Sequence, residues 1–342
     1  MIQIVMRKLT FLLVILVLAF AGVNCGSDDK GESPFHDPVL EDAIRNAIKK
    51  PTGDITESDL KDLTRFGWFK HEEYSGPRIG DLTGLEYCTN LKELNLISCG
   101  FSDLTPLSNL TSLTHLSLIE NRISDVSPLS NLTNLITLDL SLNHINDISP
   151  LTNLTNLNEL SLASNQFTNI TPISTLVNLT YLGLADNGIS DISALINLTN
   201  LSELRLGYNE IIDISGIANL TSLEELYLTN NKISDISPIV NLINLKSLVL
   251  WDNRISDISP LSELSELEYV GLNSNEITDI TPLANISGKL RLSLNNNKIT
   301  DLQPLISGNV SSVDIRNNPL SETSINVYIP QLEMRGVEVK WE

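Results

Sequence analysis

Positively charged residues are scarce in this sequence of 342 residues. Lys and Arg number 22 against 42 Asp and Glu, which gives a formal net charge of −20 at pH 7. Nucleic-acid binding needs a basic face that displaces counterions from phosphates, so this composition argues against a nucleic-acid partner. The same acidity favours solubility and repels anionic lipid headgroups. Any association with a membrane therefore requires an anchor.

Aromatic residues are also scarce, at 5 % of the chain, although hydrophobic residues make up 42 %. The core must therefore be built from Leu and Ile, which is unusual for a compact globule. A chain of this length could hold two ordinary domains, but internal repetition overrides that estimate.

The sequence lacks the patterns of a catalytic or metal site. Its four histidines share no metal-ligand spacing, and we find no nucleophile–base pair and no Gly-rich phosphate loop. The histidines are His36, His71, His115 and His144. We therefore predict that the protein is not an enzyme and that it needs no cofactor and no metal.

Long apolar runs are confined to the N-terminus. Arg7 and Lys8 precede an apolar stretch over residues 9–20, which is too short to span a bilayer. Residues 1–24 are therefore predicted to be a signal peptide, and the mature chain to be exported. No other segment is apolar enough to cross a membrane.

The site of processing has two interpretations. Ala19 and Ala21 fit an ordinary signal-peptidase site, while Cys25 stands where a bacterial lipoprotein carries its lipidated cysteine. The residues before Cys25 depart from the usual lipoprotein pattern, but residues 25–34 have the composition of a flexible tether. We favour lipid attachment at Cys25, with a free or crosslinking thiol on a secreted protein as the alternative.

A 22-residue repeat dominates the rest of the chain. The pattern LxxLxLxxNxIxDIxPLxxLxx begins at Leu91 and recurs eight more times, the last copy starting at Leu267. Further copies start at Lys289 and, imperfectly, near Val310. One repeat cannot close a core, but stacked copies bury their Leu and Ile against each other. The segment around each LxL alternates as a short strand does, so stacking predicts a parallel sheet.

This repeat, with its Ile-x-Asp-Ile-x-Pro-Leu half, resembles the leucine-rich-repeat superfamily, and within it the internalin-like class of bacterial surface proteins. The resemblance spans nearly the whole mature chain. It implies an α/β solenoid, a curved right-handed superhelix with a parallel β-sheet on its concave side and a helical N-terminal cap. We expect such a chain to be a monomer.

Two polar rows run through the repeats. An Asn follows each strand and is predicted to point inward and bond buried backbone groups of neighbouring coils. An Asp precedes most of the Pro turns, where we expect it to accept turn N–H groups; a calcium ladder is the alternative. The Asn row is Asn121, Asn143, Asn165, Asn187, Asn209, Asn231, Asn253, Asn275 and Asn297. The Asp row is Asp103, Asp125, Asp147, Asp191, Asp213, Asp235, Asp257, Asp279 and Asp301.

The two ends of the array need covers, because each exposes an unpaired apolar layer. Residues 35–68 are predicted to be a helical N-terminal cap, with one helix starting at Asp37 and another at a Thr56–Asp59 capping box. Residues 69–320 form the leucine-rich repeats, and residues 321–342 form a C-terminal cap that ends in a strand.

Cys88 and Cys99 occupy positions that usually hold Leu and Asn in adjacent half-repeats. We expect buried thiols there. A disulfide between them is the alternative, since export permits it.

Binding residues should be those that the core does not dictate, namely the outward strand positions on the concave face. The early repeats offer small or polar groups such as Asn95, Ser117, Thr137 and Asp139, and the later repeats offer Val249 among larger side chains. Exposed Tyr and Trp beside Arg are typical of interface hot spots. The predicted ligand-binding residues are Tyr181, Arg205, Tyr208, Tyr227, Trp251 and Tyr269.

The leading hypothesis is a binding protein at the cell envelope, or secreted, that recognises a protein ligand on its concave face. The resemblance adds adhesion or host interaction. A carbohydrate-binding module, for a cell-wall or host glycan, is one alternative, because the same rings could stack on sugars. A structural surface spacer is the other. Contact with a membrane is expected only through the N-terminal lipid anchor.

Overall fold

The structure, a computed structural model, describes residues 31–69, 76–284, 286 and 289–342. The predicted signal peptide and Cys25 lie outside these residues. The chain divides into two compact units, residues 1–143 and 144–342. Each unit is described by itself.

The first unit begins with two short helices. Helix α2 (Pro38–Ala47) starts at Asp37, whose side chain accepts hydrogen bonds from the backbone N–H groups of Val39 and Leu40. Helix α3 (Glu57–Lys61) starts at Thr56 and has the predicted capping box. Helix α2 buries one apolar side and packs against the first strand of the sheet, so the two helices cover the start of the array.

The strands of the first unit are parallel and follow one another in sequence order. They are β1 (Arg65–Phe69), β2 (Glu93–Ile97), β3 (His115–Ser117) and β4 (Thr137–Asp139). Three single-turn 3₁₀ helices lie opposite them: η2 (Leu85–Tyr87), η3 (Thr105–Leu107) and η4 (Ser127–Leu129). Strand β1 was not predicted. It lies within the segment that we expected to be purely helical, and it pairs with β2 residue by residue.

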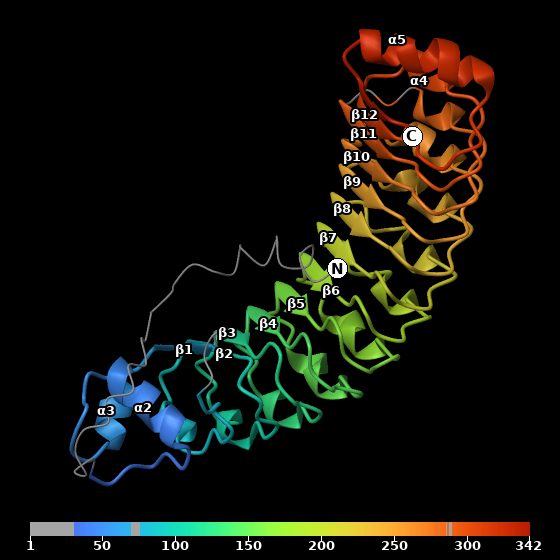
Figure 1. Ribbon diagram of the computed structural model, residues 1–342. Helices are drawn as coiled ribbons and strands as arrows, with labels where there is room; N and C mark the ends of the chain where they lie inside the picture. Colours follow the sequence, from blue (N-terminus) through green and yellow to red (C-terminus); the bar gives the residue numbers. More distant parts are fainter. Residues whose placement is uncertain (1–30, 70–75, 285, 287–288) are drawn as a thin grey trace. The chain divides into compact units, whose positions relative to one another are not determined.

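The second unit continues the same architecture. Its strands are β5 (Glu159–Ser161), β6 (Tyr181–Gly183), β7 (Glu203–Arg205), β8 (Glu225–Tyr227), β9 (Ser247–Val249), β10 (Tyr269–Gly271), β11 (Leu290–Ser293), β12 (Val310–Asp314) and β13 (Glu338–Lys340). Neighbouring strands are parallel, with one register shift between β11 and β12. Figure 1 shows these strands on the inner side of the curve that this unit follows. The predicted solenoid with a parallel sheet is confirmed.

Short helices line the opposite side of the second unit. They are η5 (Ser149–Asn153), η6 (Thr171–Thr175), η7 (Ser193–Leu195), η8 (Ser215–Ile217), η9 (Ser237–Asn241), η10 (Ser259–Glu263), η11 (Thr281–Leu283) and α4 (Gln303–Ser307). The π-helix η12 (Ser324–Tyr328) and helix α5 (Ile329–Met334) follow, before β13 pairs with β12. The predicted final strand of the C-terminal cap is therefore present, as β13.

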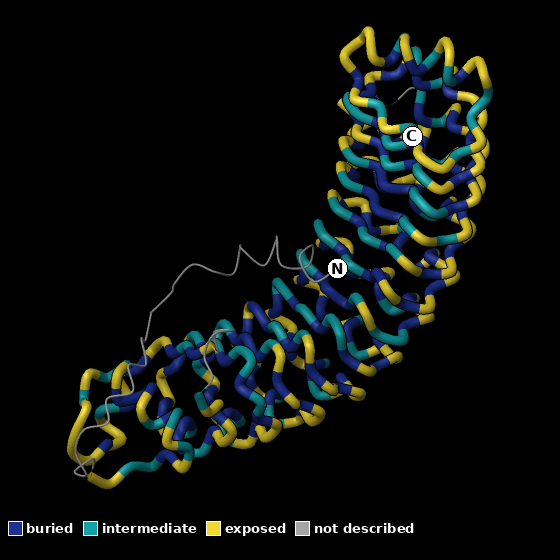
Figure 2. Tube along the Cα trace, viewed as in Figure 1, coloured by how far each residue is buried: buried dark blue, intermediate teal, exposed yellow. Residues whose placement is uncertain are grey.

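The core consists of the Leu and Ile rows. Leu94, Leu116 and Leu138, the central strand residues of three successive repeats, are at most 2 % exposed. Figure 2 shows buried residues between the strand side and the turn side, with exposed residues concentrated at the turns. Burial of these rows from water is the main stabilising term for such an array.

The Asn row bonds the backbone as predicted. The side-chain amide of Asn209 donates to the carbonyl oxygens of Leu184 and Leu206, each at 3.0 Å, and its Oδ1 accepts the N–H of Ile189 at 3.1 Å. Each such Asn joins two consecutive coils. Asn187 also donates to both coils, but its buried Oδ1 has no partner among the described residues.

The Asp row also has its predicted role. Asp257 Oδ1 accepts the backbone N–H of Ser259 at 2.8 Å, at the first residue of the 3₁₀ helix η10. All nine members of the row make the equivalent bond. The backbone bond, with a second bond from the Ser side chain, lowers the pKa values of Asp125, Asp191 and Asp235. The pKa of Asp279 is lowered first by the Thr281 hydroxyl and then by the backbone bond. Within the described residues, no group of three His, Cys, Asp or Glu side chains is arranged to hold a metal ion.

One residue before each inward Asn has a left-handed backbone conformation. In the second unit these residues are Ser164, Asp186, Tyr208, Asn230, Asp252, Ser274, Asn296 and Asn317, with φ between 53° and 58°. This conformation costs about 1 kcal/mol for a residue with a Cβ. The N–H of Tyr208 donates to Thr229 O at 2.7 Å, so bonds to the next coil hold the turn in place.

Cys88 and Cys99 are free, buried thiols. Burial raises the pKa of Cys88 to about 12 and also raises that of Cys99. The alternative of a disulfide between them is wrong.

Among the residues that the structure describes, no helix combines the length and the apolarity that crossing a membrane requires.

Candidate functional site

The candidate site lies on the outward side of the strands in the second unit, which we call the strand face. In each strand a buried Leu or Val is flanked by two outward residues, so the strand face carries two main rows of side chains. A third row comes from the second residue after each strand and includes Trp251. Because the core does not dictate these rows, they are free to vary.

Arg205 lies between two aromatic rings on this face. Its guanidinium carbon is 5.9 Å from the ring centre of Tyr181 and 4.9 Å from that of Tyr227. Strand pairing places Gly183 and Tyr227 directly beside Arg205. A Cβ on Gly183 would lie 2.9 Å from the Tyr181 hydroxyl, so the absence of a side chain there lets Tyr181 lie across the strand toward Arg205.

Two carboxylates complete this group, which we call the Arg205 cluster: Tyr181, Glu203, Arg205, Glu225 and Tyr227. Arg205 Nε donates to Glu203 Oε1 at 2.6 Å. The hydroxyl of Tyr227 donates to Glu225. Burial alone would lower the pKa of Arg205, but the interactions with Tyr181 and Glu203 outweigh it and raise that pKa. The guanidinium is therefore a fixed positive charge on an acidic protein.

A second aromatic group lies further along the strand face. The Trp251 indole lies over Gly271, where a Cβ would collide with its Nε1. The buried indole N–H lies near Tyr269 but makes no hydrogen bond of normal geometry with any described residue. Arg291 lies 5.6 Å from the centre of the Tyr269 ring. Burial raises the pKa of Tyr269, while Arg291 opposes that shift.

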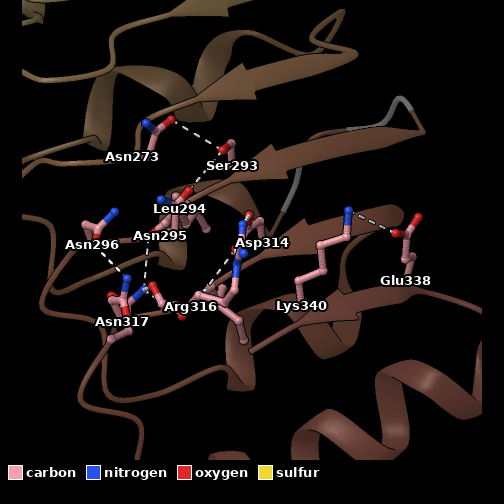
Figure 3. A network of polar contacts seen from close by, with 12 residues as sticks. Asn273, Ser293, Leu294, Asn295, Asn296, Asp314, Arg316, Asn317, Glu338 and Lys340 are labelled. Carbon is pink, nitrogen blue, oxygen red and sulfur yellow. Dashed lines mark hydrogen bonds and ion pairs between the residues drawn. The ribbon is translucent and has the colours of Figure 1, made fainter. Parts of the chain in front are cut away.

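The last repeats carry amides and ion pairs in place of rings (Figure 3). Ser293 Oγ lies 3.3 Å from the side-chain oxygens of both Asn273 and Asn295. Arg316 donates to both oxygens of Asp314, from Nε at 2.9 Å and from Nη2 at 2.6 Å. The strand face therefore changes along its length from aromatic to polar.

A family model for leucine-rich repeats, which describes two copies at a time, matches the chain at seven places, of which the first six overlap. These are residues 89–131, 111–153, 133–176, 155–197, 177–217, 199–241 and 243–285. Together they cover more than half of the sequence. No curated protein matches the sequence significantly.

Similar solved structures indicate which class of leucine-rich-repeat proteins the chain resembles. An internalin (inlF) from Listeria monocytogenes is 32 % identical, with a TM-score of 0.76 over 90 % of this chain and 97 % of its own. Internalin C2 (inlC2) from the same species is 36 % identical, with a TM-score of 0.54 over 71 % of this chain and 97 % of its own. The chain belongs to the leucine-rich-repeat family, in its internalin-like class.

A third similar structure is a component of a complex. The leucine-rich-repeat protein FLRT2, solved in an octameric complex with latrophilin 3 and Unc5D, is 25 % identical, with a TM-score of 0.60 over 74 % of this chain and 84 % of its own. Proteins of this family are generally modules for protein–protein interaction, and internalin-like repeats are a binding scaffold rather than a catalytic one.

The predicted site residues of this internalin-like protein fall into three groups. Tyr181, Arg205 and Tyr227 are brought together, and Trp251 and Tyr269 form the second group. Tyr208 is 40 % exposed but lies in the left-handed turn after β7, not on a strand.

Three other outward positions of this leucine-rich-repeat protein were predicted wrongly. Val249, Ser117 and Thr137 are each no more than 9 % exposed. Small outward side chains on a tightly spaced sheet are covered by larger neighbours, and the repeat pattern alone does not show this. Arg291 was not predicted as a site residue, although its position beside Tyr269 follows from strand register.

Proposed function

We propose that this protein is an exported binding protein that recognises a protein ligand through the strand face of its second unit, in adhesion or in interaction with a host. The Arg205 cluster is the observation that carries the proposal. Two rings, one guanidinium and two carboxylates are fixed to one another on a face where the solenoid requires none of them.

Such a group suits recognition for an energetic reason. Association costs about 0.5–1.5 kcal/mol for each flexible side chain that it immobilises. Tyr181, Arg205 and Tyr227 are already held by stacking and by Glu203 and Glu225, so most of this cost is met before a partner arrives. Tyr, Trp and Arg are also the residues that most often dominate interface energetics.

The proposal includes location. Residues 1–24 direct export, and a lipid on Cys25 holds the chain at the cell envelope, with residues 25–34 as the tether. The acidic body supports an anchor of this kind, because its net charge of −20 disfavours direct contact with anionic lipids. The protein acts as a monomer.

The test compares protein capture by the wild type with capture by Tyr227→Ala/Trp251→Ala. A matched control, Val177→Ala/Ile243→Ala, removes two apolar side chains that are 45 % and 56 % exposed in turns away from the strand face. We expect the strand-face variant to lose a protein partner that the control retains, with affinity reduced at least about thirtyfold, since one hot-spot truncation costs about 2 kcal/mol.

Two outcomes contradict this proposal. Retention of every partner by the strand-face variant, with an unchanged circular dichroism spectrum, favours a spacer role. Loss of binding to a cell-wall or host glycan, with no change in protein capture, favours a carbohydrate-binding module, in which the same rings stack on sugars.

A further inference from the structure

Arg205 has two donor atoms that the Arg205 cluster leaves unused. Its only hydrogen bond with a described residue is from Nε to Glu203. The terminal nitrogens Nη1 and Nη2 donate to no described residue, and they are not among the buried polar atoms that lack a partner, so solvent reaches them. The edge of the guanidinium between Nη1 and Nη2 therefore remains open.

The plane of this guanidinium is fixed. Tyr181 and Tyr227 lie on either side of it, and the 2.6 Å bond from Nε to Glu203 limits rotation within the plane. An Arg side chain that is already ordered loses less rotamer entropy for each hydrogen bond that it forms. The open edge is thus presented in one orientation.

Two parallel N–H donors match the two oxygens of a carboxylate. The chain itself shows a guanidinium paired in this way: Arg316 donates to both oxygens of Asp314, at 2.9 Å and 2.6 Å. On the strand face Arg316 is therefore satisfied within the chain, whereas Arg205 is only partly satisfied.

The surrounding residues allow access and limit repulsion. Gly207, the second residue after β7, has no side chain to cover the open edge, while the Tyr181 hydroxyl lies over Gly183, the partner of Arg205 in strand register. The nearest acidic groups, Glu203 and Glu225, are already hydrogen-bonded to Arg205 and Tyr227.

From this geometry we infer that the Nη1–Nη2 edge of Arg205 binds the side-chain carboxylate of an Asp or Glu on the protein partner. The inference rests on the proposed function and adds the chemistry of one contact to it. Arg205 is then the residue that makes the strand face select for an acidic side chain in a protein that otherwise repels acids.

The experiment measures the Arg side-chain NMR signals of the isotope-labelled protein during titration with small probes. The probe is capped glutamate, N-acetylglutamate N-methylamide, and the neutral control is the corresponding capped glutamine. We expect a saturable shift of the Arg205 Nη signals with glutamate and none with glutamine. The Arg316 signals, already paired with Asp314, serve as the internal control and should not move.

Two variants and one further probe make the result decisive. The variants lack the Arg205 signals, so their binding is compared with that of the wild type through the broadening of the probe's own NMR signals. Arg205→Gln should weaken glutamate binding at least about tenfold, since charge-assisted hydrogen bonds to a guanidinium are lost. Arg205→Lys keeps the charge without the planar edge and should recover only part of the binding. N-Acetylglycine presents a main-chain carboxylate, so tighter binding of that probe overturns the assignment to an acidic side chain.

An equal shift with glutamine, or equal shifts at Arg205 and Arg316, also overturns the inference. These results do not bear on capture of a protein partner, which is measured separately with Tyr227→Ala/Trp251→Ala. A failure of the carboxylate site is thereby distinguishable from a failure of the proposed function.

Discussion

Replacing Asn231 by Ala should destabilise the second unit strongly. The Asn231 amide donates to Leu206 O at 3.0 Å and to Leu228 O at 3.1 Å, and its Oδ1 accepts the N–H of Ile211 at 3.0 Å. The side chain is 8 % exposed, so Ala leaves one N–H and two carbonyls without these partners in a dry interior. Each orphaned buried group costs about 1–3 kcal/mol. We expect a loss of about 3–5 kcal/mol in the free energy of unfolding.

Asn187 provides an internal comparison for this estimate. Asn187 makes the same donor bonds, to Leu162 O at 3.2 Å and Leu184 O at 3.1 Å, but its Oδ1 has no partner among the described residues. Asn187→Ala therefore orphans the carbonyls without orphaning an N–H. It should cost about 1–2 kcal/mol less than Asn231→Ala.

Urea unfolding followed by circular dichroism measures both values, and Asn219→Ala is the control. Asn219 is exposed, and its replacement should change the free energy of unfolding by no more than about 0.5 kcal/mol. The reasoning is refuted if Asn187→Ala and Asn231→Ala cost the same, or if Asn231→Ala is indistinguishable from the control. The first result would mean that the hydrogen bond to Oδ1 contributes nothing, and the second that water replaces the amide at no cost.

Two further predictions concern the acidic turns and the anchor. The turn N–H that Asp235 accepts lowers its pKa, so its stabilisation is complete above the unfolded pKa of about 3.9 and is lost as pH falls through the folded pKa. Asp235→Ala should lower the urea midpoint at pH 7, and this loss should shrink as the pH falls below about 3.9, because a protonated Asp235 keeps only a neutral hydrogen bond. Asp235→Asn should lower the midpoint less than Asp235→Ala at pH 7, since Asn169 accepts the equivalent N–H at 3.0 Å. Cys25→Ser should abolish incorporation of a labelled fatty acid and release the protein from the envelope; incorporation that persists in the variant contradicts the anchor.

The sequence alone was sufficient for the repeated part of the fold, and the reason is physical. Every coil needs the same buried Leu, the same inward Asn and the same turn Asp, so each requirement appears in the chain as a fixed spacing. Leu94 is buried and Asp257 caps its turn as that spacing predicts. Strand β1 was not predicted because it lies before the first regular repeat, and its residues Arg65–Phe69 lack the Leu-x-Leu pattern.

The left-handed conformation of the turn residues was not predicted, for a different reason. Local preference would place Gly or Asn there, but the chain uses Glu120, Leu142 and Tyr208 as well. Their conformation is imposed by bonds to the next coil, so no signal exists in the residues themselves. Tyr208 was assigned to the strand face because an exposed aromatic residue after a strand looks the same in the sequence whether it lies on the sheet or in the turn.

The arrangement of the candidate site depends on glycines that the sequence pattern gives no reason to notice. Gly within a strand is unfavourable by roughly 0.5–1 kcal/mol relative to Ala. Two outward strand positions of the second unit nevertheless hold Gly, and at both of them an aromatic side chain occupies the space: Tyr181 over Gly183 and Trp251 over Gly271. The backbone geometry of the solenoid requires neither glycine, since φ is ordinary at both. Because each of these two rings occupies the space that a Cβ would fill, the two glycines determine where Tyr181 and Trp251 lie on the strand face.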